Sequence, residues 1–247
     1  ILDGIDIVVN FAAETFVDYS IKDPKRFIDS NILGVFNLLE QARKSGIKKF
    51  LQVSTDEVYG SLPDGEFATE EYPLRPGNPY AASKAAADML CLSYYNTFHV
   101  PITIVRCENN YGERQGPEKA IPVFIKHILE EKPVPLYGNG KHKRMWLYVK
   151  DCCRMIEQVM VAGRHGEIYN VGSCREIENI ALLDQVAYLL GKHYEINFIP
   201  DKTARPGHDR RYGIDTAKFL MEFPLQKFGD KLLEVVAWYK AQHQKQS

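Results

Sequence analysis

The chain has 247 residues and a formal net charge of −1, and 45% of its residues are hydrophobic. This length suffices for a substantial core in one large domain or two small ones, and the composition is that of an ordinary globular protein. The near-zero charge argues against a nucleic-acid or anionic-membrane partner, and no run of about 18 apolar residues predicts a membrane span.

Five cysteines are spread through the sequence without CxxC spacing. An odd number argues against a disulfide scaffold, and the spacing argues against a zinc site. We therefore predict no metal and a reducing, cytoplasmic location. The five are Cys91, Cys107, Cys152, Cys153 and Cys174.

A buried strand is predicted first, over residues 5–11, because a β-branched apolar run stands there between Asp-Gly and small residues. Apolar residues at helical spacing then predict a helix over residues 24–45, with Gly46 as its C-cap. A second strand follows at residues 49–54.

A second helix is predicted over residues 80–98 and a third strand over residues 102–106. Strands alternating with helices through short connections indicate parallel βαβ units and a doubly wound sheet. The predicted fold class is therefore α/β.

The pattern changes past residue 110. A helix over residues 121–131 and a strand over residues 133–137 stand among loops rich in Gly and Pro. A helix at residues 149–161 and a strand at residues 167–171 can return to the main sheet. From about residue 176 the chain is typical of a smaller α+β cap.

The motif Tyr80-Ala-Ala-Ser-Lys84 opens the second predicted helix. Residues four apart stand on one helix face, about 6 Å apart along the axis. The pKa of a free tyrosine is about 10, and we expect the Lys84 ammonium to lower the pKa of Tyr80. Such a pair can take a proton from a sugar hydroxyl while its hydride passes to a nicotinamide. The spacing is common by chance, so its surroundings must support this interpretation.

Thr55, Asp56 and Glu57 directly follow the second predicted strand. Residues at the carboxyl end of a strand in an open α/β sheet face the ligand crevice. A threonine hydroxyl there can hydrogen-bond a reacting oxygen, and two adjacent carboxyl groups add acid/base chemistry that a plain dehydrogenase does not need. The alternative is that Asp56 and Glu57 only cap a loop or a helix start.

The segments STDEVYG (residues 54–60) and NPYAASKAAAD (residues 78–88) closely resemble the extended short-chain dehydrogenases, and among them the dTDP-glucose 4,6-dehydratases. The resemblance runs in order through nearly the whole chain. Its other segments are NFAAET (10–15), RCENNYGERQGPEKAIP (106–122), PVPLYGNGKHKRMWLYVKD (133–151), YNVGS (169–173) and ARPGHDRRYGIDTAK (204–218).

The resemblance implies a Rossmann-type doubly wound parallel sheet that lacks its first strands, with a smaller α+β substrate-binding cap. The NAD-binding domain would comprise residues 1–110 and about 149–175, and the cap about 111–148 and 176–247. NAD is the implied cofactor, dTDP-glucose the implied substrate, and a homodimer the implied assembly. The activity would be that of a lyase of deoxysugar biosynthesis.

The resemblance also implies a role for each residue of the two motifs. Tyr80 and Thr55 would contact the glucosyl 4-hydroxyl, with Tyr80 as the base. Lys84 would hold Tyr80 and the nicotinamide ribose. Glu57 would remove the C5 proton, while Asp56 would protonate the departing 6-hydroxyl. NAD would be regenerated within the cycle.

Binding residues follow from the same resemblance. The cofactor would contact Tyr80, Lys84, Phe11, Ala12, Ala13, Glu14, Thr15, Ser30 and Asn110. The nucleotide sugar would contact Thr15, Thr55, Asn109, Lys119, Ala120, Pro135, Leu136, Tyr137, Arg144, Asn179, Ala204, Arg205, Pro206, Gly207 and His208. Arg144 and Arg205 suit a diphosphate, because a guanidinium binds phosphate oxygens bidentately.

The sequence departs from the family pattern at several places. It contains no G-x-x-G-x-x-G turn for the NAD pyrophosphate, so we expect roughly 60–80 residues of the family pattern, about two βαβ units, to be missing at the start. Phe16 stands where the family has histidine, Tyr19 where arginine is common, and Met145 where aspartate is usual. Glu108 adds an acid beside Asn109. These four differences bear on substrate identity more than on reaction type.

Two alternatives to a dehydratase remain open. A nucleotide-sugar 4-epimerase or decarboxylase of the same family shares the Tyr-Lys pair, but epimerases usually carry small residues in place of Asp56 and Glu57. Many decarboxylases keep the glutamate after a serine. A non-catalytic remnant is the other alternative, because of the absent glycine turn.

Overall fold

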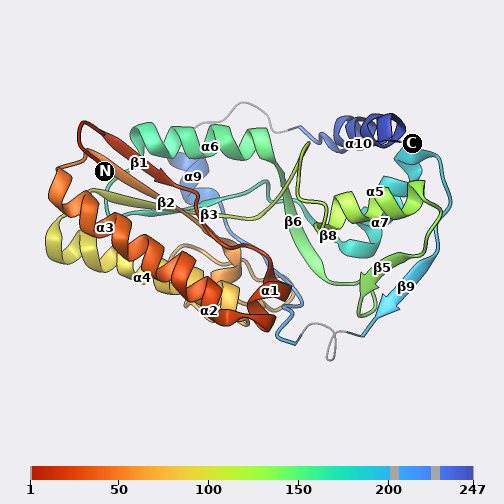
Figure 1. The fold of residues 1–247 in the computed structure, drawn as a ribbon, viewed down its shortest axis with the longest axis horizontal. Helices are drawn as coiled ribbons and strands as arrows, with labels where there is room; N and C mark the ends of the chain where they lie inside the picture. Colours follow the sequence, from red (N-terminus) through yellow and green to blue (C-terminus); the bar gives the residue numbers. More distant parts are fainter. Residues whose placement is uncertain (1, 201–205, 224–228, 247) are drawn as a thin grey trace.

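Four parallel strands form the main sheet in the computed structural model, which describes residues 2–200, 206–223 and 229–246. The strands pair in the order β1, β2, β3 and β7, as Figure 1 shows. Their bounds are β1 Ile7–Asn10, β2 Lys49–Thr55, β3 Ile102–Cys107 and β7 Ile168–Val171. The predicted parallel sheet is confirmed, and so is the return of the strand near residue 168.

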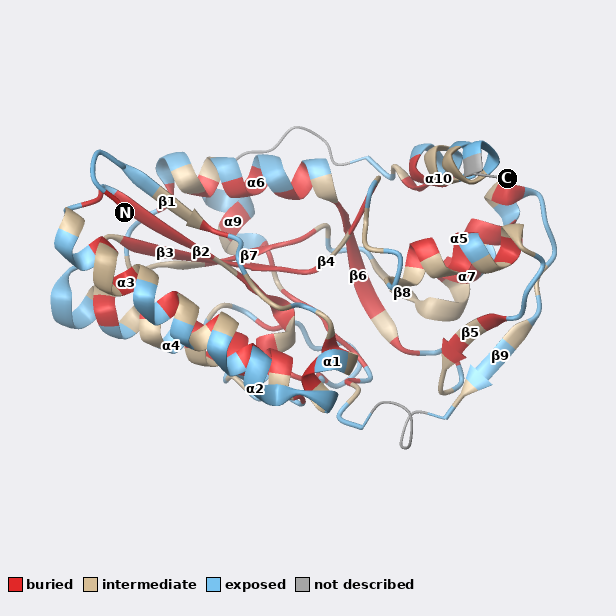
Figure 2. Ribbon diagram, viewed as in Figure 1, coloured by how far each residue is buried: buried red, intermediate tan, exposed pale blue. Residues whose placement is uncertain are grey.

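Helices cover both faces of this sheet. Phe50 packs in one apolar cluster with residues of α3 (Gly34–Ser45) and α4 (Pro79–Phe98), whereas Leu51 packs with residues of α6 (Val149–Ala162). Successive strand residues point to opposite faces, so a strand buried on both sides reads as a continuous apolar run. Figure 2 shows β2 and β3 as buried between the helical layers.

The helix expected over residues 24–45 is not one regular α-helix. It consists of α2 (Pro24–Phe27), a π-helical turn η1 (Ile28–Leu33) and α3. A π turn inserts an extra residue and rotates the side chains that follow, and Asn31 is buried here with 1% exposure. Gly46 ends α3 with a φ of +62°, which confirms the predicted C-cap.

A second layered unit lies beside the main sheet (Figure 1). One apolar cluster joins its helices to a two-stranded parallel sheet of β5 and β9. A three-stranded sheet in the order β4, β6, β8 lies next to it. The bounds are β4 Asn109–Tyr111, α5 Ala120–Leu129, β5 Val134–Tyr137, β6 Lys143–Tyr148, β8 Glu176–Glu178, α7 Asn179–Leu190, β9 Ile196–Ile199 and α10 Leu232–Gln246.

One short helix of the expected cap packs on the main sheet instead. Phe219 of α9 (Ala217–Glu222) is fully buried in the cluster that holds Met155 of α6 and Tyr169 of β7. The division of the chain into two domains otherwise stays a prediction.

The outer edge of β1 has no partner strand in the described part of the chain. Ile7 is 41% exposed there, and Ile5 just before it is 44% exposed. Such an edge is open to further pairing. None of the helices described combines the length and apolar character that a membrane crossing requires.

Candidate active site

The site begins where β2 and β3 end. Thr55 and Cys107 are register partners at the ends of these strands. The turn η2 (Asp56–Tyr59) follows at once, and the Thr55 hydroxyl accepts a hydrogen bond from the Glu57 backbone N–H at 3.3 Å. Threonine favours this capping position because its oxygen satisfies a free N–H of the turn. Thr55 is therefore the cap of this turn, whereas Asp56 and Glu57 lie within it.

Tyr80 and Lys84 lie on the first two turns of α4, beside the end of β2. The Asn78 side chain caps this helix by accepting from the Ala81 N–H at 2.9 Å. Both side chains are buried, with 7% and 5% exposure. The Lys84 ammonium donates to the Val53 carbonyl at 2.7 Å.

The expectation that Lys84 lowers the pKa of Tyr80 is wrong for this structure. Burial raises the pKa of Tyr80 well above its ordinary range, and the carboxyl groups of Glu57 and Asp56 raise it further. Burial also lowers the pKa of Lys84. A positive charge beyond Lys84 is therefore needed before Tyr80 can act as a base near neutral pH.

Glu57 is held from across the cleft by a residue that the sequence prediction missed. The Tyr212 hydroxyl lies 3.0 Å from Glu57 Oε2 and 2.8 Å from Asp209 Oδ2. The Arg144 guanidinium stacks on the Tyr212 ring, 4.2 Å from its centroid. Tyr212 lies within the family-like segment 204–218, but nothing in its local pattern signals a partner 155 residues away.

Asp56 lies deeper than Glu57 and is 2% exposed. Its Oδ1 accepts from the Thr55 hydroxyl at 3.2 Å, and its Oδ2 has no hydrogen-bond partner within the described residues. Burial raises the pKa of Asp56 well above its usual value, and Glu57 adds to this. The two adjacent carboxyl groups therefore differ in environment, as an acid and a base in one site must.

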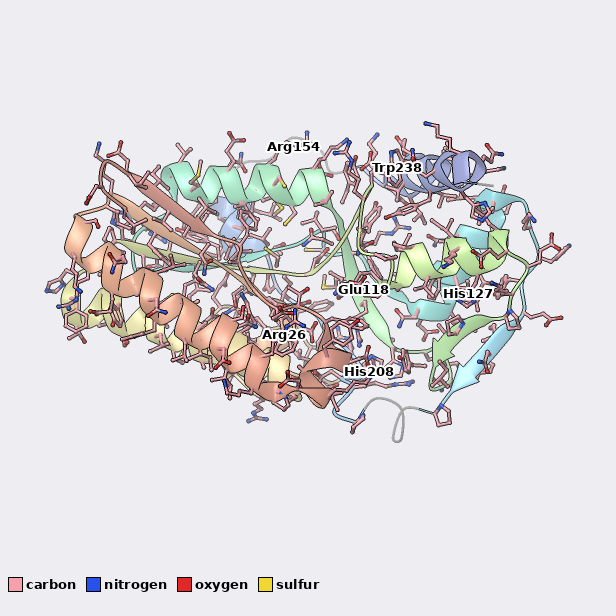
Figure 3. All side chains as sticks on the ribbon, viewed as in Figure 1. Arg26, Glu118, His127, Arg154, His208 and Trp238 are labelled. Carbon is pink, nitrogen blue, oxygen red and sulfur yellow. The ribbon has the colours of Figure 1, made fainter. Side chains whose placement is uncertain are left out.

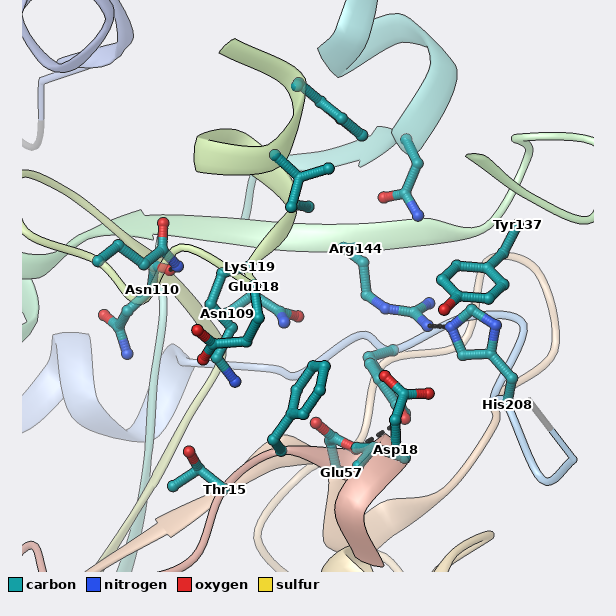
Figure 4. Close-up of a pocket in the computed structure, with 18 of the residues that line it drawn as sticks. Thr15, Asp18, Glu57, Asn109, Asn110, Glu118, Lys119, Tyr137, Arg144 and His208 are labelled. Atoms are coloured by element: carbon teal, nitrogen blue, oxygen red, sulfur yellow. Dashed lines mark hydrogen bonds between the residues drawn. The ribbon is translucent and has the colours of Figure 1, made fainter. Parts of the chain in front are cut away.

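A cleft of about 260 Å³ opens in front of Glu57 (Figure 4). Twelve of the predicted site residues line it: Thr15, Glu57, Asn109, Asn110, Lys119, Ala120, Pro135, Leu136, Tyr137, Arg144, Asn179 and His208. The lining residues that the sequence prediction missed are Phe16, Val17, Asp18, Asn78, Gln115, Glu118, Val123, Phe124, Trp146 and Tyr212. Figure 3 shows Glu118 and His208 near the middle of the molecule, between its two halves.

The other predicted residues lie outside this lining. They are Phe11, Ala12, Ala13, Glu14, Ser30, Thr55, Asp56, Tyr80, Lys84, Pro206 and Gly207. Thr55, Asp56, Tyr80 and Lys84 form the buried floor beside Glu57, and Pro206 and Gly207 precede His208 at the rim. Ala204 and Arg205 lie outside the described residues.

Arg144 and Lys119 bring positive charge to the described lining of the cleft. Arg144 on β6 lies 3.1 Å from His208 Nε2 and donates to the Asp209 carbonyl at 2.7 Å. The Lys119 ammonium lies over the Phe16 ring, 5.4 Å from its centroid. Cations that line a partly enclosed cleft suit an anionic ligand.

The loop after β1 is anchored to α4 by Asn31. The Asn31 amide accepts from the Glu14 N–H at 2.8 Å and donates to the Glu14 carbonyl at 3.0 Å and to the Ser83 hydroxyl at 2.9 Å. Arg26, labelled in Figure 3, pairs with the Glu14 carboxylate. The π turn that buries Asn31 therefore fixes the loop that would line the cofactor.

A Rossmann-type sheet with a Tyr-Lys pair at its carboxyl edge and a cation-lined cleft is typical of a dehydrogenase-type enzyme with an anionic ligand. The family model described as GDP-mannose 4,6 dehydratase matches residues 3–223. A dTDP-glucose 4,6-dehydratase of Streptomyces niveus is 43% identical over 244 residues, covering 97% of this chain and 71% of that protein. The chain belongs to the nucleotide-sugar 4,6-dehydratase family, as its motifs predict.

Solved structures agree in fold. DesIV, a dTDP-glucose 4,6-dehydratase from Streptomyces venezuelae crystallised with NAD and TYD bound, has a TM-score of 0.93 and 40% identity. The similarity covers 99% of this chain and 76% of that one. A UDP-glucuronic acid 4-epimerase from Bacillus cereus, in complex with UDP-glucuronic acid and NAD, has a TM-score of 0.92 at 28% identity, over 98% of this chain and 77% of that one. The fold is thus shared with epimerases, and the site must decide the reaction.

Proposed function

We propose that the protein removes water from a nucleotide-diphosphate hexose, dTDP-glucose, and forms the 4-keto-6-deoxy sugar with NAD as its cofactor. The observation that carries this proposal is the pair Asp56 and Glu57 beside Tyr80. One carboxyl group is buried with a raised pKa, and the other faces the cleft. A 4-epimerase expels no hydroxyl group and needs no such acid and base.

The residues at the strand ends fit NAD. Phe11 is 57% exposed at the carboxyl end of β1, where an open α/β sheet binds its ligand, and Asn31 fixes the loop behind it. Phe11 to Thr15, Ser30, Asn110, Tyr80 and Lys84 would hold the cofactor. When bound, NAD supplies a cationic ring that accepts the hydride from C4 and returns it at C6.

Oxidation at C4 requires a base for the 4-hydroxyl proton. Tyr80 lies at the floor of the site beside Thr55, whose hydrogen bond lowers the pKa of Tyr80 against the effect of burial. The positive charge of the cofactor ring would favour the phenolate in the same direction. Tyr80 is therefore the acceptor of this proton, and Thr55 orients the hydroxyl group.

Elimination across C5 and C6 requires a base and an acid on neighbouring carbons. Glu57 lines the cleft and is held by Tyr212, so it is placed to take the C5 proton. Asp56 keeps its proton because burial raises its pKa, and it can give that proton to the departing 6-hydroxyl. The proton on Glu57 returns to C5 when the hydride reaches C6.

One more proton transfer is needed to return the site to its starting state. After each turnover Tyr80 has gained the 4-hydroxyl proton, and Asp56 has lost one proton to water. The Thr55 hydroxyl donates to Asp56 at 3.2 Å and also hydrogen-bonds Tyr80. Thr55 therefore links Tyr80 to Asp56 and can pass the proton on Tyr80 back to Asp56.

The diphosphate would lie between Arg144 and Lys119, the lysine and arginine found in the described lining of the cleft. His208 adds a ring nitrogen beside Arg144. The sugar would extend towards Glu57 past Asn109 and Thr15, and the base would extend towards Pro135, Leu136, Tyr137 and Asn179.

The test combines the purified protein with NAD and dTDP-glucose and follows the product by NMR. We expect a 4-keto-6-deoxy sugar and NAD binding in equilibrium dialysis. A product that differs only in configuration at C4 would indicate an epimerase. A protein that binds no NAD and converts no substrate would be the non-catalytic remnant.

Assembly and location belong to the same proposal. The turn η1 and the helices α3 and α4 pack together and expose Leu33, Phe36 and Met89, which fits a homodimer interface. All five cysteines are free thiols, which fits a cytoplasmic protein.

A further inference from the structure

Glu108 directly follows β3, as Asp56 directly follows β2. Thr55 and Cys107 are register partners at the strand ends, so Asp56 and Glu108 are the first residues beyond two hydrogen-bonded parallel strands. Adjacent strands lie about 4.8 Å apart. Asp56 and Glu108 are 2% and 3% exposed, and the charge of Glu108 raises the pKa of Asp56, so two interacting acids lie in the interior.

Among the described residues, one carboxylate oxygen of Glu108 has hydrogen-bond partners, and these partners are uncharged. Its Oε1 accepts from the Ser173 N–H at 2.9 Å and from the Ser173 hydroxyl at 2.7 Å. Its Oε2 has no hydrogen-bond partner within the described residues, like Oδ2 of Asp56. Gly172 allows this packing, because a Cβ there would lie 2.3 Å from Glu108 Oε2.

The charged groups that face this pair favour a single negative charge on it. Burial raises the pKa of Glu108 to about 7, while the two Ser173 hydrogen bonds favour its ionised form. Glu57 and Glu108 both raise the pKa of Asp56, and Arg144 opposes them. Two buried carboxyl groups this close cannot both ionise readily.

We propose that Glu108 is a positioning residue for dehydration, which takes the negative charge of the buried pair and thereby keeps the proton on Asp56. Asp56 must carry that proton when the 6-hydroxyl leaves. The inference rests on the proposed function, since it assigns Glu108 to the elimination step of that reaction.

Glu108→Gln separates charge from hydrogen bonding. The glutamine carbonyl can still accept from Ser173, but it cannot hold a negative charge beside Asp56. In a plot of kcat against pH, we expect the alkaline limb of the variant to move to lower pH by on the order of one pH unit. Activity should fall roughly tenfold on that limb and change little at acid pH. Glu108→Asp keeps a carboxyl group and should restore part of the shift.

Two measurements separate this role from a structural one. At alkaline pH the Glu108→Gln variant should still oxidise C4, so the reduced nicotinamide accumulates in the holoenzyme. In the protein without substrate, ¹³C NMR of labelled aspartate should place the pKa of Asp56 lower than in the parent. Glu131→Gln removes an exposed carboxylate on another surface and should leave the profile unchanged.

Ser173→Ala provides a second variant if Glu108→Gln does not fold. Removing the hydroxyl raises the pKa of Glu108, so less charge forms beside Asp56 and the limb should move in the same direction by a smaller amount. A working dehydratase whose alkaline limb and Asp56 pKa stay unchanged in both variants would overturn the inference. A parent protein that performs no dehydration would instead overturn the proposed function.

Discussion

Tyr80 is proposed to accept the 4-hydroxyl proton and Glu57 the C5 proton. Replacing one or the other should therefore stop the reaction at different steps. Glu57→Gln leaves C4 oxidation possible but removes the base for C5, so the reduced nicotinamide should accumulate with a 4-keto hexose. General acid–base groups contribute about 10²–10⁴-fold, and we expect a loss of turnover in that range. Absorbance of the reduced nicotinamide in a single turnover measures the difference.

Tyr80→Phe is the matched comparison. Without an acceptor for the 4-hydroxyl proton, hydride transfer should not begin and no reduced nicotinamide should form. Equal nicotinamide signals in the two variants would show that the separate roles are wrong. Glu57 would then be a carboxylate that orients the substrate.

Glu108 also predicts how stability depends on pH. Its pKa rises from an ordinary 4.5 to about 7 in the folded protein, so the folded state holds this proton more tightly than the unfolded state. Its contribution is fully present below pH 4.5 and is lost as pH rises towards 7. Relative to Glu108→Gln, the parent should lose about 3 kcal/mol of unfolding free energy across that window. Urea denaturation at a series of pH values measures this difference. A difference in unfolding free energy between parent and variant that stays the same at every pH would contradict the raised pKa of Glu108.

At the scale of elements, the turn η2 depends on Gly60. Gly60 ends the turn that carries Asp56 and Glu57, with a φ of +73°, and a Cβ there would lie 2.0 Å from the Arg75 carbonyl oxygen. We expect Gly60→Ala to cost more than about 4 kcal/mol of unfolding free energy and to reduce turnover, because the turn must move.

Gly65 is the control for that substitution. Its φ is +83°, but no atom lies within 4 Å of the added Cβ. Gly65→Ala should cost only about 1 kcal/mol, the penalty of a left-handed backbone. Thermal unfolding of both variants tests this, and equal losses would mean that φ alone decides.

The regular elements could be predicted because their signals are local. The strand at Lys49–Thr55 carries Phe50 on one face and Leu51 on the other, and Gly46 marks the end of α3. The π turn could not be predicted, because its sequence keeps ordinary helical spacing and only the burial of Asn31 against Glu14 and Ser83 reveals it.

The site was predictable to the same extent. Motifs that recur in the family predict Thr55, Glu57 and Arg144 as site residues, and Glu57 and Arg144 line the cleft. Tyr212 was missed because its role exists only through a contact with Glu57 across the fold. The pKa of Tyr80 was predicted in the wrong direction, because sequence spacing shows a neighbouring lysine but not burial.

At the scale of the whole molecule, the cleft joins two halves with separate cores. The floor of Thr55, Asp56 and Tyr80 belongs to the main sheet, whereas Tyr137 and Asn179 belong to the second unit. A ligand that contacts both walls would therefore link the two units. This arrangement allows related proteins to share the fold while differing in the few residues on the floor.

The exposed apolar side chains of η1, α3 and α4 predict a homodimer. Leu33, Phe36 and Met89 are 49%, 41% and 46% exposed on helices that pack together on one face of the sheet (Figure 1). Burying this surface against a second copy would remove apolar area from water and stabilise the dimer by about 25 cal/mol per Å².

We expect light scattering to give a dimer at micromolar concentration for the parent and a monomer for Phe36→Asp. Leu233→Asp, at a 60% exposed position on α10, should stay dimeric, so only a change confined to the α3 and α4 face supports this interface. A parent protein that is monomeric under these conditions would contradict the prediction.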